Sequence, residues 1–415
     1  MSPRISDLAE LENEDDELVP EILPVDARLS VRGPSATFQS LFDRAAAVTP
    51  AKEIISGTGF ALLEAFSASP GTTAYVKVSA TDGDLTVSMV ADGVSVTVPG
   101  SVLVPGKKIA EILRLAPTEQ AKIEVLGTTA TIRSGRAQWT VQTPVGHALP
   151  PAADVSAITT YSLAVGDLLD ALTVARRAAS TSSARASLMQ LAVSQGSITG
   201  LDGGRLHRQR VQNLPAALRA TIPLRVSEEV IRMLRATGSE TVEMGSSDSH
   251  LVFRVDQDTL IAQRLLVDFP DVESQVLGPV LTNTWALTVD RDRLLQAIRR
   301  VRVNADPDYQ ALFVSLVPGR VLDSGMTWNL SLSARDRSGN SAAETLDASW
   351  SGPATSRSLC VNHRYLSDLL AATSGEFVTL RIGEDSKAVR LPVLIEDTAS
   401  GFLGWVQQMR PGYLT

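Results

Sequence analysis

The chain has 415 residues, of which 44% are apolar, a length and composition that predict two to four globular domains. Its single cysteine, Cys360, excludes an intramolecular disulfide and fits a reducing compartment, so we expect a cytoplasmic protein associated with the nucleoid only if it binds DNA. No apolar stretch reaches the ~18 residues of a membrane-spanning helix, and the N-terminus is acidic where an export signal would be basic. We therefore expect a soluble protein that is not exported.

The net charge of −8 is concentrated at the N-terminus. Residues 1–27 contain nine acidic residues and one basic residue, which accounts for all of it, and the remaining chain has 37 residues of each sign. Like charges repel and the segment lacks helical or strand periodicity over most of its length, so we expect a disordered tail. The alternative is a tail that shields a DNA-binding surface or mimics DNA.

One pattern occurs six times after residue 27: a short β-branched strand, a turn, and an amphipathic helix. Ser227, Asp290 and Asn362 each follow the valine that marks a repeat, where a side-chain oxygen can cap the first turn of a helix. We expect each repeat to contain one helix and three or four antiparallel strands. The marker valines are spaced 61 to 73 residues apart and are Val31, Val104, Val165, Val226, Val289 and Val361.

Between the helices, apolar and polar residues alternate as they do in half-buried strands. This alternation predicts hairpins at residues 84–98, 130–143, 250–266 and 376–395, the first of them turning at Asp92 and Gly93. One repeat cannot bury both its helix and its sheet, so pairs of repeats should join into domains. We expect an α+β chain of three similar domains after the tail, with the limits 28–148, 149–279 and 280–415.

Five local strings occur in the order and at the approximate spacing known from one family, the bacterial β sliding clamps. They are PGSVLVPGKKIAEILRLAP (99–117), IRSGRAQWTVQTP (132–144), LDGGRL (201–206), LLVDFPD (265–271) and WVQQMRPG (405–412). Over residues 28–415 the chain therefore resembles the β subunit of DNA polymerase III, and the first string is closest to actinobacterial clamps.

That resemblance implies a head-to-tail homodimer whose six domains form a ring around duplex DNA, with helices lining the hole. Such a ring slides without reading the DNA sequence and tethers DNA polymerase, the clamp loader and repair proteins, giving the polymerase processivity. It has no enzymatic activity and no cofactor. The residues that we expect to contact phosphates are Lys52, Arg176, Arg177, Arg225 and Arg299, although each could equally be part of a solvated helix face.

The resemblance also implies a partner-peptide pocket between the second and third domains, where short peptides of other proteins bind. Gly204, Gln407 and Gln408 depart from the family, which has a larger residue and a Met-Pro pair there, and Pro411 replaces a terminal leucine. We therefore expect a shallower, more polar pocket, unless LDGGRL is simply a turn between strands. The expected pocket residues are Leu201, Gly203, Gly204, Arg205, Leu206, Pro270, Val406, Gln407, Gln408, Met409 and Arg410.

The ring implied by the resemblance needs an interface between the first domain of one subunit and the third of the other. The segment 335–347 on the third domain is less acidic than is usual in the family, so apolar burial must contribute more of the association. The expected interface charges are the basic Lys108, Arg133 and Arg136 and the acidic Asp336 and Glu344.

Catalytic and metal sites are not predicted. The four histidines lie far apart and none has a Cys or acidic neighbour at metal-ligand spacing. Cys360 and His363 are three residues apart, but the resemblance places the first in a strand and the second at a helix start, so we expect a core thiol. The alternatives to a working clamp are a clamp-like scaffold that no longer loads on DNA, and a specialised, inhibitor-resistant second copy.

Overall fold

The computed structural model describes residues 28–265, 267–282, 284–322, 325–383 and 391–410, so the acidic segment at residues 1–27 lies outside the described residues. The chain forms two compact units, Met1–Ala153 and Asp154–Thr415. Within the described ranges, no helix is long and apolar enough to cross a membrane.

The first unit contains two half-units of the same order, a strand, a helix and three further strands. The first half-unit consists of β1 (Arg28–Pro34), α1 (Ser35–Val48), β2 (Ala61–Phe66), β3 (Tyr75–Thr81) and β4 (Leu85–Ala91). An additional strand, β5 (Ser95–Val98), precedes the second. The second consists of β6 (Gly100–Val104), α2 (Gly106–Arg114), β7 (Gln120–Leu126), β8 (Thr129–Ser134) and β9 (Ala137–Gln142).

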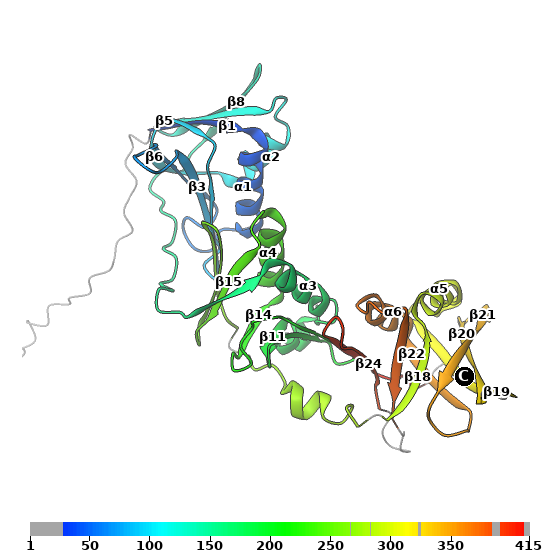
Figure 1. Ribbon diagram of the computed structural model, residues 1–415. Helices are drawn as coiled ribbons and strands as arrows, with labels where there is room; N and C mark the ends of the chain where they lie inside the picture. Colours follow the sequence, from blue (N-terminus) through cyan, green and yellow to red (C-terminus); the bar gives the residue numbers. More distant parts are fainter. Residues whose placement is uncertain (1–27, 266, 283, 323–324, 384–390, 411–415) are drawn as a thin grey trace, which may run out of the picture. The chain divides into compact units, whose positions relative to one another are not determined.

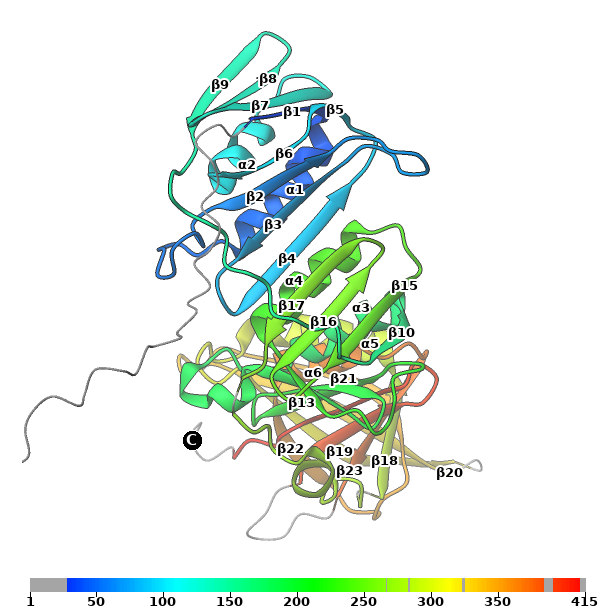
Figure 2. The ribbon, with the colours of Figure 1, turned by 90° about the vertical axis from the view of Figure 1, so that its left-hand side faces the viewer.

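The two half-units of the first unit exchange their first strands (Figure 2). β1 pairs with β7 of the second half, and β6 pairs with β2 of the first, so the sheets have the orders β5-β1-β7-β8-β9 and β6-β2-β3-β4. The hairpin expected at residues 84–98 is therefore wrong. β4 pairs with β3 and β5 pairs with β1, so Asp92 and Gly93 connect strands of different sheets.

The second unit contains four more half-units of the same order (Figure 1). The first two are β10 (Thr160–Ala164), α3 (Val165–Arg176), β11 (Gln190–Ser194), β12 (Ser197–Leu201), β13 (Arg205–Arg210), and β14 (Ala220–Pro223), α4 (Leu224–Ala236), β15 (Thr241–Ser246), β16 (His250–Val255), β17 (Asp258–Gln263). The last two are β18 (Trp285–Asp290), α5 (Arg291–Val301), β19 (Ala311–Leu322), β20 (Gly325–Arg335), β21 (Ser341–Trp350), and β22 (Arg357–Asn362), α6 (His363–Ala371), β23 (Phe377–Ile382), β24 (Val393–Asp397), β25 (Phe402–Val406). Short helical turns η1 (Ser183–Leu188), η2 (Val272–Leu277) and η3 (Arg302–Asn304) lie in the connections.

The same strand exchange occurs twice in the second unit. β10 pairs with β15 and β14 with β11, while β18 pairs with β23 and β22 with β19. The two pairs of half-units are joined by antiparallel pairing of β13 with β25, where Arg205 lies opposite Val406. The chain is thus three exchanged pairs of half-units, which agrees with the expected α+β fold of three similar domains. The exact domain limits stay a prediction.

Two of the three predicted helix caps are confirmed. Asp290 accepts a hydrogen bond from Arg293 N at 2.8 Å, and Asn362 accepts one from Arg364 N at 2.9 Å. The cap at Ser227 is wrong, because α4 begins at Leu224, directly after Pro223, and Ser227 lies within the helix. Its hydroxyl instead donates to the carbonyl of Leu224 at 2.7 Å.

The helices bury one apolar face, as the repeat pattern predicts. In α5, Leu294, Ile298 and Val301 are at most 1% exposed and belong to the core between α5, α6 and their sheets. Full burial of such a side chain stabilises the fold by roughly 1.5–3 kcal/mol. The hairpins β8–β9 and β16–β17 are confirmed, as is the paired part of β23–β24.

Candidate partner-peptide pocket

The string LDGGRL forms the turn between β12 and β13. Asp202 holds the turn with one carboxylate oxygen, Oδ1, which accepts hydrogen bonds from Gly204 N at 2.8 Å and Arg205 N at 3.0 Å. Gly203 has φ +88°, a left-handed conformation that favours glycine. Leu201 and Leu206 close the turn as a pair in register. The alternative of a turn between strands is therefore correct as local structure, and the function of the turn depends on what surrounds it.

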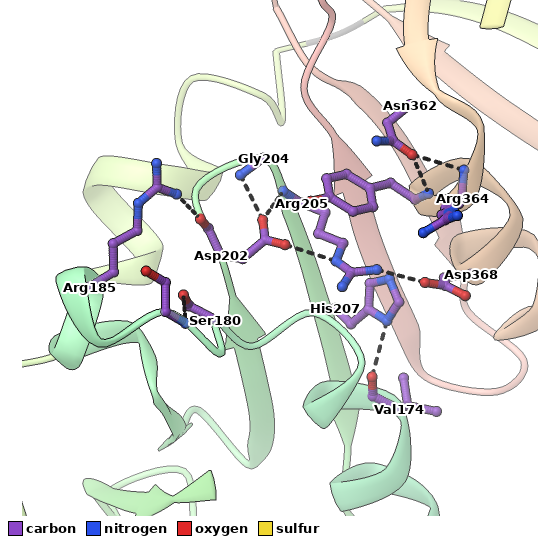
Figure 3. A network of polar contacts seen from close by, with 12 residues as sticks. Val174, Ser180, Arg185, Asp202, Gly204, Arg205, His207, Asn362, Arg364 and Asp368 are labelled. Carbon is purple, nitrogen blue, oxygen red and sulfur yellow. Dashed lines mark hydrogen bonds and ion pairs between the residues drawn. The ribbon is translucent and has the colours of Figure 1, made fainter. Parts of the chain in front are cut away.

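Arg205 is fixed by three groups (Figure 3). Its Nε lies 3.0 Å from Asp202 Oδ2, and a terminal nitrogen lies 2.6 Å from Asp368 Oδ2 on α6. Its guanidinium carbon lies 4.2 Å from the centroid of the Tyr365 ring, a cation–π contact. Because the Arg205 side chain is only 15% exposed, these contacts tie β13 to α6 in a partly desolvated site.

Tyr365 lies beside the turn and is half-buried. Burial raises the pKa of its hydroxyl, and the neighbouring carboxylate of Asp202 raises the pKa further. A Cβ on Gly204 would lie 3.2 Å from Tyr365 Cε2, so a larger residue at position 204 would press on the ring. Arg185 of η1 donates to the Asp202 carbonyl from the other side. Tyr365, Asp368 and Arg185 belong to this site, and the sequence strings did not contain them.

The residues after β25 lie against the same turn. Gln407 N donates to the Gly204 carbonyl at 2.8 Å, which extends the pairing of β13 with β25. Gln408 is 5% exposed and its amide donates to the Leu391 carbonyl at 2.7 Å. Of the two glutamines expected to make the pocket polar, only Gln407 is accessible. Met409 N donates to the Cys360 carbonyl at 2.7 Å, which places half-buried Met409 beside β22.

The apolar residues expected to anchor a peptide are mostly buried. Leu201 and Leu206 are 4% and 0% exposed and pack with the linker that contains η2. Val406 is fully buried in the adjacent core. Pro270 is half-buried and lines a separate groove of about 510 Å³ with Phe269 and Arg219. The structure thus brings together Gly203, Gly204, Arg205, Gln407 and Tyr365 at the surface of the pocket, above Leu201 and Leu206.

His207 follows Arg205 by two residues and ties the same strand to α3. It is 0% exposed, and its Nδ1 lies 3.0 Å from the carbonyl oxygen of Val174. Burial lowers the pKa of His207 to about 4, and the charges of Arg205 and Arg177 lower it further, against the hydrogen bond to Val174. The imidazole is therefore neutral at pH 7. Within the described residues, no group of three or more His, Cys, Asp or Glu side chains could hold a metal ion.

Residues 71–148 match the family model of the N-terminal domain of the DNA polymerase III beta subunit. The beta sliding clamp of C. crescentus aligns with a TM-score of 0.78 and 19% identity, over 93% of this chain and 100% of that one. The DNA polymerase III subunit beta of Pseudomonas aeruginosa aligns with a TM-score of 0.76 and 18% identity, over 92% and 100%. The sliding clamp of Bacillus subtilis gives 0.76 and 16%, over 92% and 100%. The chain has the fold of a bacterial β sliding clamp. No curated protein matches the sequence.

On this clamp fold, the expected DNA-contacting residues all lie at the surface. Lys52 is exposed in the loop after α1 of the first unit. Arg225 begins α4, Arg177 ends α3 and Arg299 lies in the last turn of α5, and all three are exposed. Arg176 forms an ion pair with Glu228 of α4.

Most of the charges expected at the clamp interface have partners within their own unit. Lys108 lies 3.0 Å from Glu111, and Arg133 pairs with Glu124. Glu344 of β21 lies 2.8 Å from Arg300 Nε, and Asp336 accepts hydrogen bonds from the backbone of its own turn. Arg136, in the exposed turn between β8 and β9, has no ion pair within the described part of the chain.

Proposed function

We propose that this chain is a sliding clamp, which encircles duplex DNA and tethers the replicative polymerase and other DNA-processing proteins. The observation that carries the proposal is the sixfold repeat of one strand-exchanged half-unit, in a chain that spans the whole length of solved clamps. The exposed arginines at the ends of α3, α4 and α5 support sequence-independent contact with phosphates. On this proposal the chain is a non-catalytic accessory subunit.

We further propose that two copies close head to tail. β9 is the last strand of its sheet, and β21 pairs with β18 only at Ser349 and Trp350, so both strands carry an edge without a strand partner among the described residues. Open edges favour pairing with another chain. Val303, which is 78% exposed in η3, provides apolar surface in the same pair of half-units as β21.

Loading onto DNA tests this function directly. The protein, with a clamp loader and ATP, should remain on nicked circular plasmid during gel filtration and be lost when the plasmid is linearised, because a ring is held by topology. Sedimentation at micromolar concentration should show a dimer. A persistent monomer that is never retained on circular DNA would refute the clamp and favour the scaffold that only docks partners.

The partner-peptide pocket is the proposed docking site for polymerase, loader and repair proteins. The accessible Gln407 and the missing side chain at Gly204 favour weaker binding of a consensus clamp-binding peptide than in clamps with the usual residues. Fluorescence anisotropy with that peptide measures the difference. Affinity equal to that of an ordinary clamp would contradict the altered pocket and the inhibitor-resistant copy, while leaving the sliding function intact.

A further inference from the structure

The rim of the partner-peptide pocket is basic. Arg185, Arg364 and Arg410 are exposed around the turn that contains Gly203 and Gly204. Arg185 reaches the Asp202 carbonyl, and Arg410 follows Met409, whose N–H binds Cys360, two residues before the cap of α6. The only carboxylates bound to Arg205 are Asp202 and Asp368, so these four arginines exceed those two acids by two charges.

The position of Arg364 is unfavourable for folding. It lies in the first turn of α6, which contains no acidic residue, and its N–H is capped by Asn362. Backbone dipoles make a helix N-terminus positive, so a cation there is destabilising and an anion is favoured. A local conflict of this kind is expected where a site serves binding. The rim therefore fits an acidic ligand whose apolar residues contact the half-buried Tyr365 and Met409.

The chain itself contains a segment with this chemistry. Residues 1–27 carry nine acidic residues and one basic residue. Apolar side chains alternate with these acids, at Ile5, Leu8, Leu11, Leu18, Val19, Ile22 and Leu23. The segment joins the described fold at β1, and 27 residues can span up to about 90 Å.

We propose that residues 1–27 dock in the partner-peptide pocket and compete there with the peptides of other proteins. This inference rests on the proposed function of the pocket. Charge complementarity with the rim provides the attraction, and the apolar residues distinguish the pocket from the exposed helix arginines, which offer charge alone. Because the segment is covalently attached, its effective concentration is on the order of millimolar, so a weak contact is enough to occupy the pocket.

A binding experiment with the separate segment tests the contact. A fluorescent peptide of residues 1–27 is titrated into protein lacking those residues, a deletion that removes no described strand or helix. Saturable binding should weaken severalfold in Arg364→Gln and in Arg185→Gln, and disappear at high salt. The matched control is Arg235→Gln, which removes an exposed arginine from the end of α4. Absence of saturable binding, or equal weakening by the control, would overturn the proposal.

Competition tests the consequence. A consensus clamp-binding peptide should bind the shortened protein about tenfold more tightly than the full chain, if the attached segment occupies the pocket ten times out of eleven. Equal affinity for both proteins would overturn the inference and leave the pocket as a peptide site. If the consensus peptide binds neither protein while the separate segment still binds the rim, the proposed function of the pocket fails instead. Weakening of the segment's binding by Arg225→Gln and Arg299→Gln alone would place it on the helices and also overturn the proposal.

Discussion

The polar side chains of β13 and the arginines at the helix ends are two contrasting charged regions. Arg205 and His207 are 15% and 0% exposed, and each joins the strand to a helix through a defined contact. Arg177 and Arg299 are exposed, with no ion pair in the described parts of the chain. Fixed charges suit recognition of one peptide geometry, whereas mobile exposed charges suit phosphates at any position along DNA. The following experiments separate the two.

Acid should affect the fixed region most. The pKa of His207 is about 4 in the fold and 6.5 when unfolded, so its neutral form stabilises the protein above pH 6.5. That stability should be lost as the pH falls from 6.5 to 4, by about 3 kcal/mol. Urea unfolding at pH 7 and pH 4.5 measures the loss. His363, whose pKa is also lowered to about 4, contributes in the same direction.

The variant His207→Gln keeps a donor for the Val174 carbonyl but does not titrate. It should therefore be less sensitive to acid than the wild-type protein, with the contribution of His363 remaining. An unchanged dependence on pH in this variant would show that His207 is not held neutral by the fold.

Replacing Arg205 should reduce both stability and peptide binding. Arg205→Gln leaves two carboxylates without their cation, and Asp202 is only 14% exposed, so we expect a loss of about 2 kcal/mol. Peptide affinity should fall at least about tenfold, since the turn and α6 are no longer tied. Arg210→Gln, at the exposed end of the same strand, is the control and should change neither. Equal effects of the two substitutions would mean that the fixed contacts contribute nothing specific.

The caps sharpen the comparison on a smaller scale. Asn362→Ala removes two hydrogen bonds at the start of α6, beside Tyr365, and should lower stability by about 1 kcal/mol. Ser227→Ala removes a hydroxyl that bonds within α4 and caps nothing, so its effect should be smaller. Thermal unfolding of both variants measures the difference, and a larger loss for Ser227→Ala would contradict the assigned caps.

The smallest effect on stability is expected in the exposed region. Arg299→Gln should change stability by less than about 0.5 kcal/mol. The dependence of DNA affinity on salt should nevertheless become shallower by about one unit of slope, as expected for the loss of one phosphate contact. Arg219→Gln, an exposed arginine outside the helices, is the control. An unchanged salt slope for Arg299→Gln would remove this residue from the DNA-contacting set.

The sequence predicted the six helices because each buries an apolar stripe at helical spacing, as in Leu294 and Ile298. It misplaced the start of α4 because the strand before it ends at Pro223, three residues ahead of the valine used as a marker. The hairpin expected at Asp92 failed for a related reason. Alternation shows that segments are strands, but it does not show which strands pair.

The strings located the LDGGRL turn and the segment after β25, because both are continuous in sequence. They could not locate Tyr365 and Asp368, which reach the turn from α6, more than 150 residues further along the chain. Arg185 was missed for the same reason, since its contact is with a backbone carbonyl and leaves no mark in composition. Contacts between distant segments require the fold.

The exchange of first strands has a consequence for how each domain comes apart. When β14 leaves the strands that follow α4 to complete the sheet of β11, neither half retains a full sheet if the other unfolds. A cut in the connection between two such halves should therefore leave them interlocked, and they should melt as a single cooperative body. Expressed separately, either half would present an incomplete sheet and would be prone to aggregate.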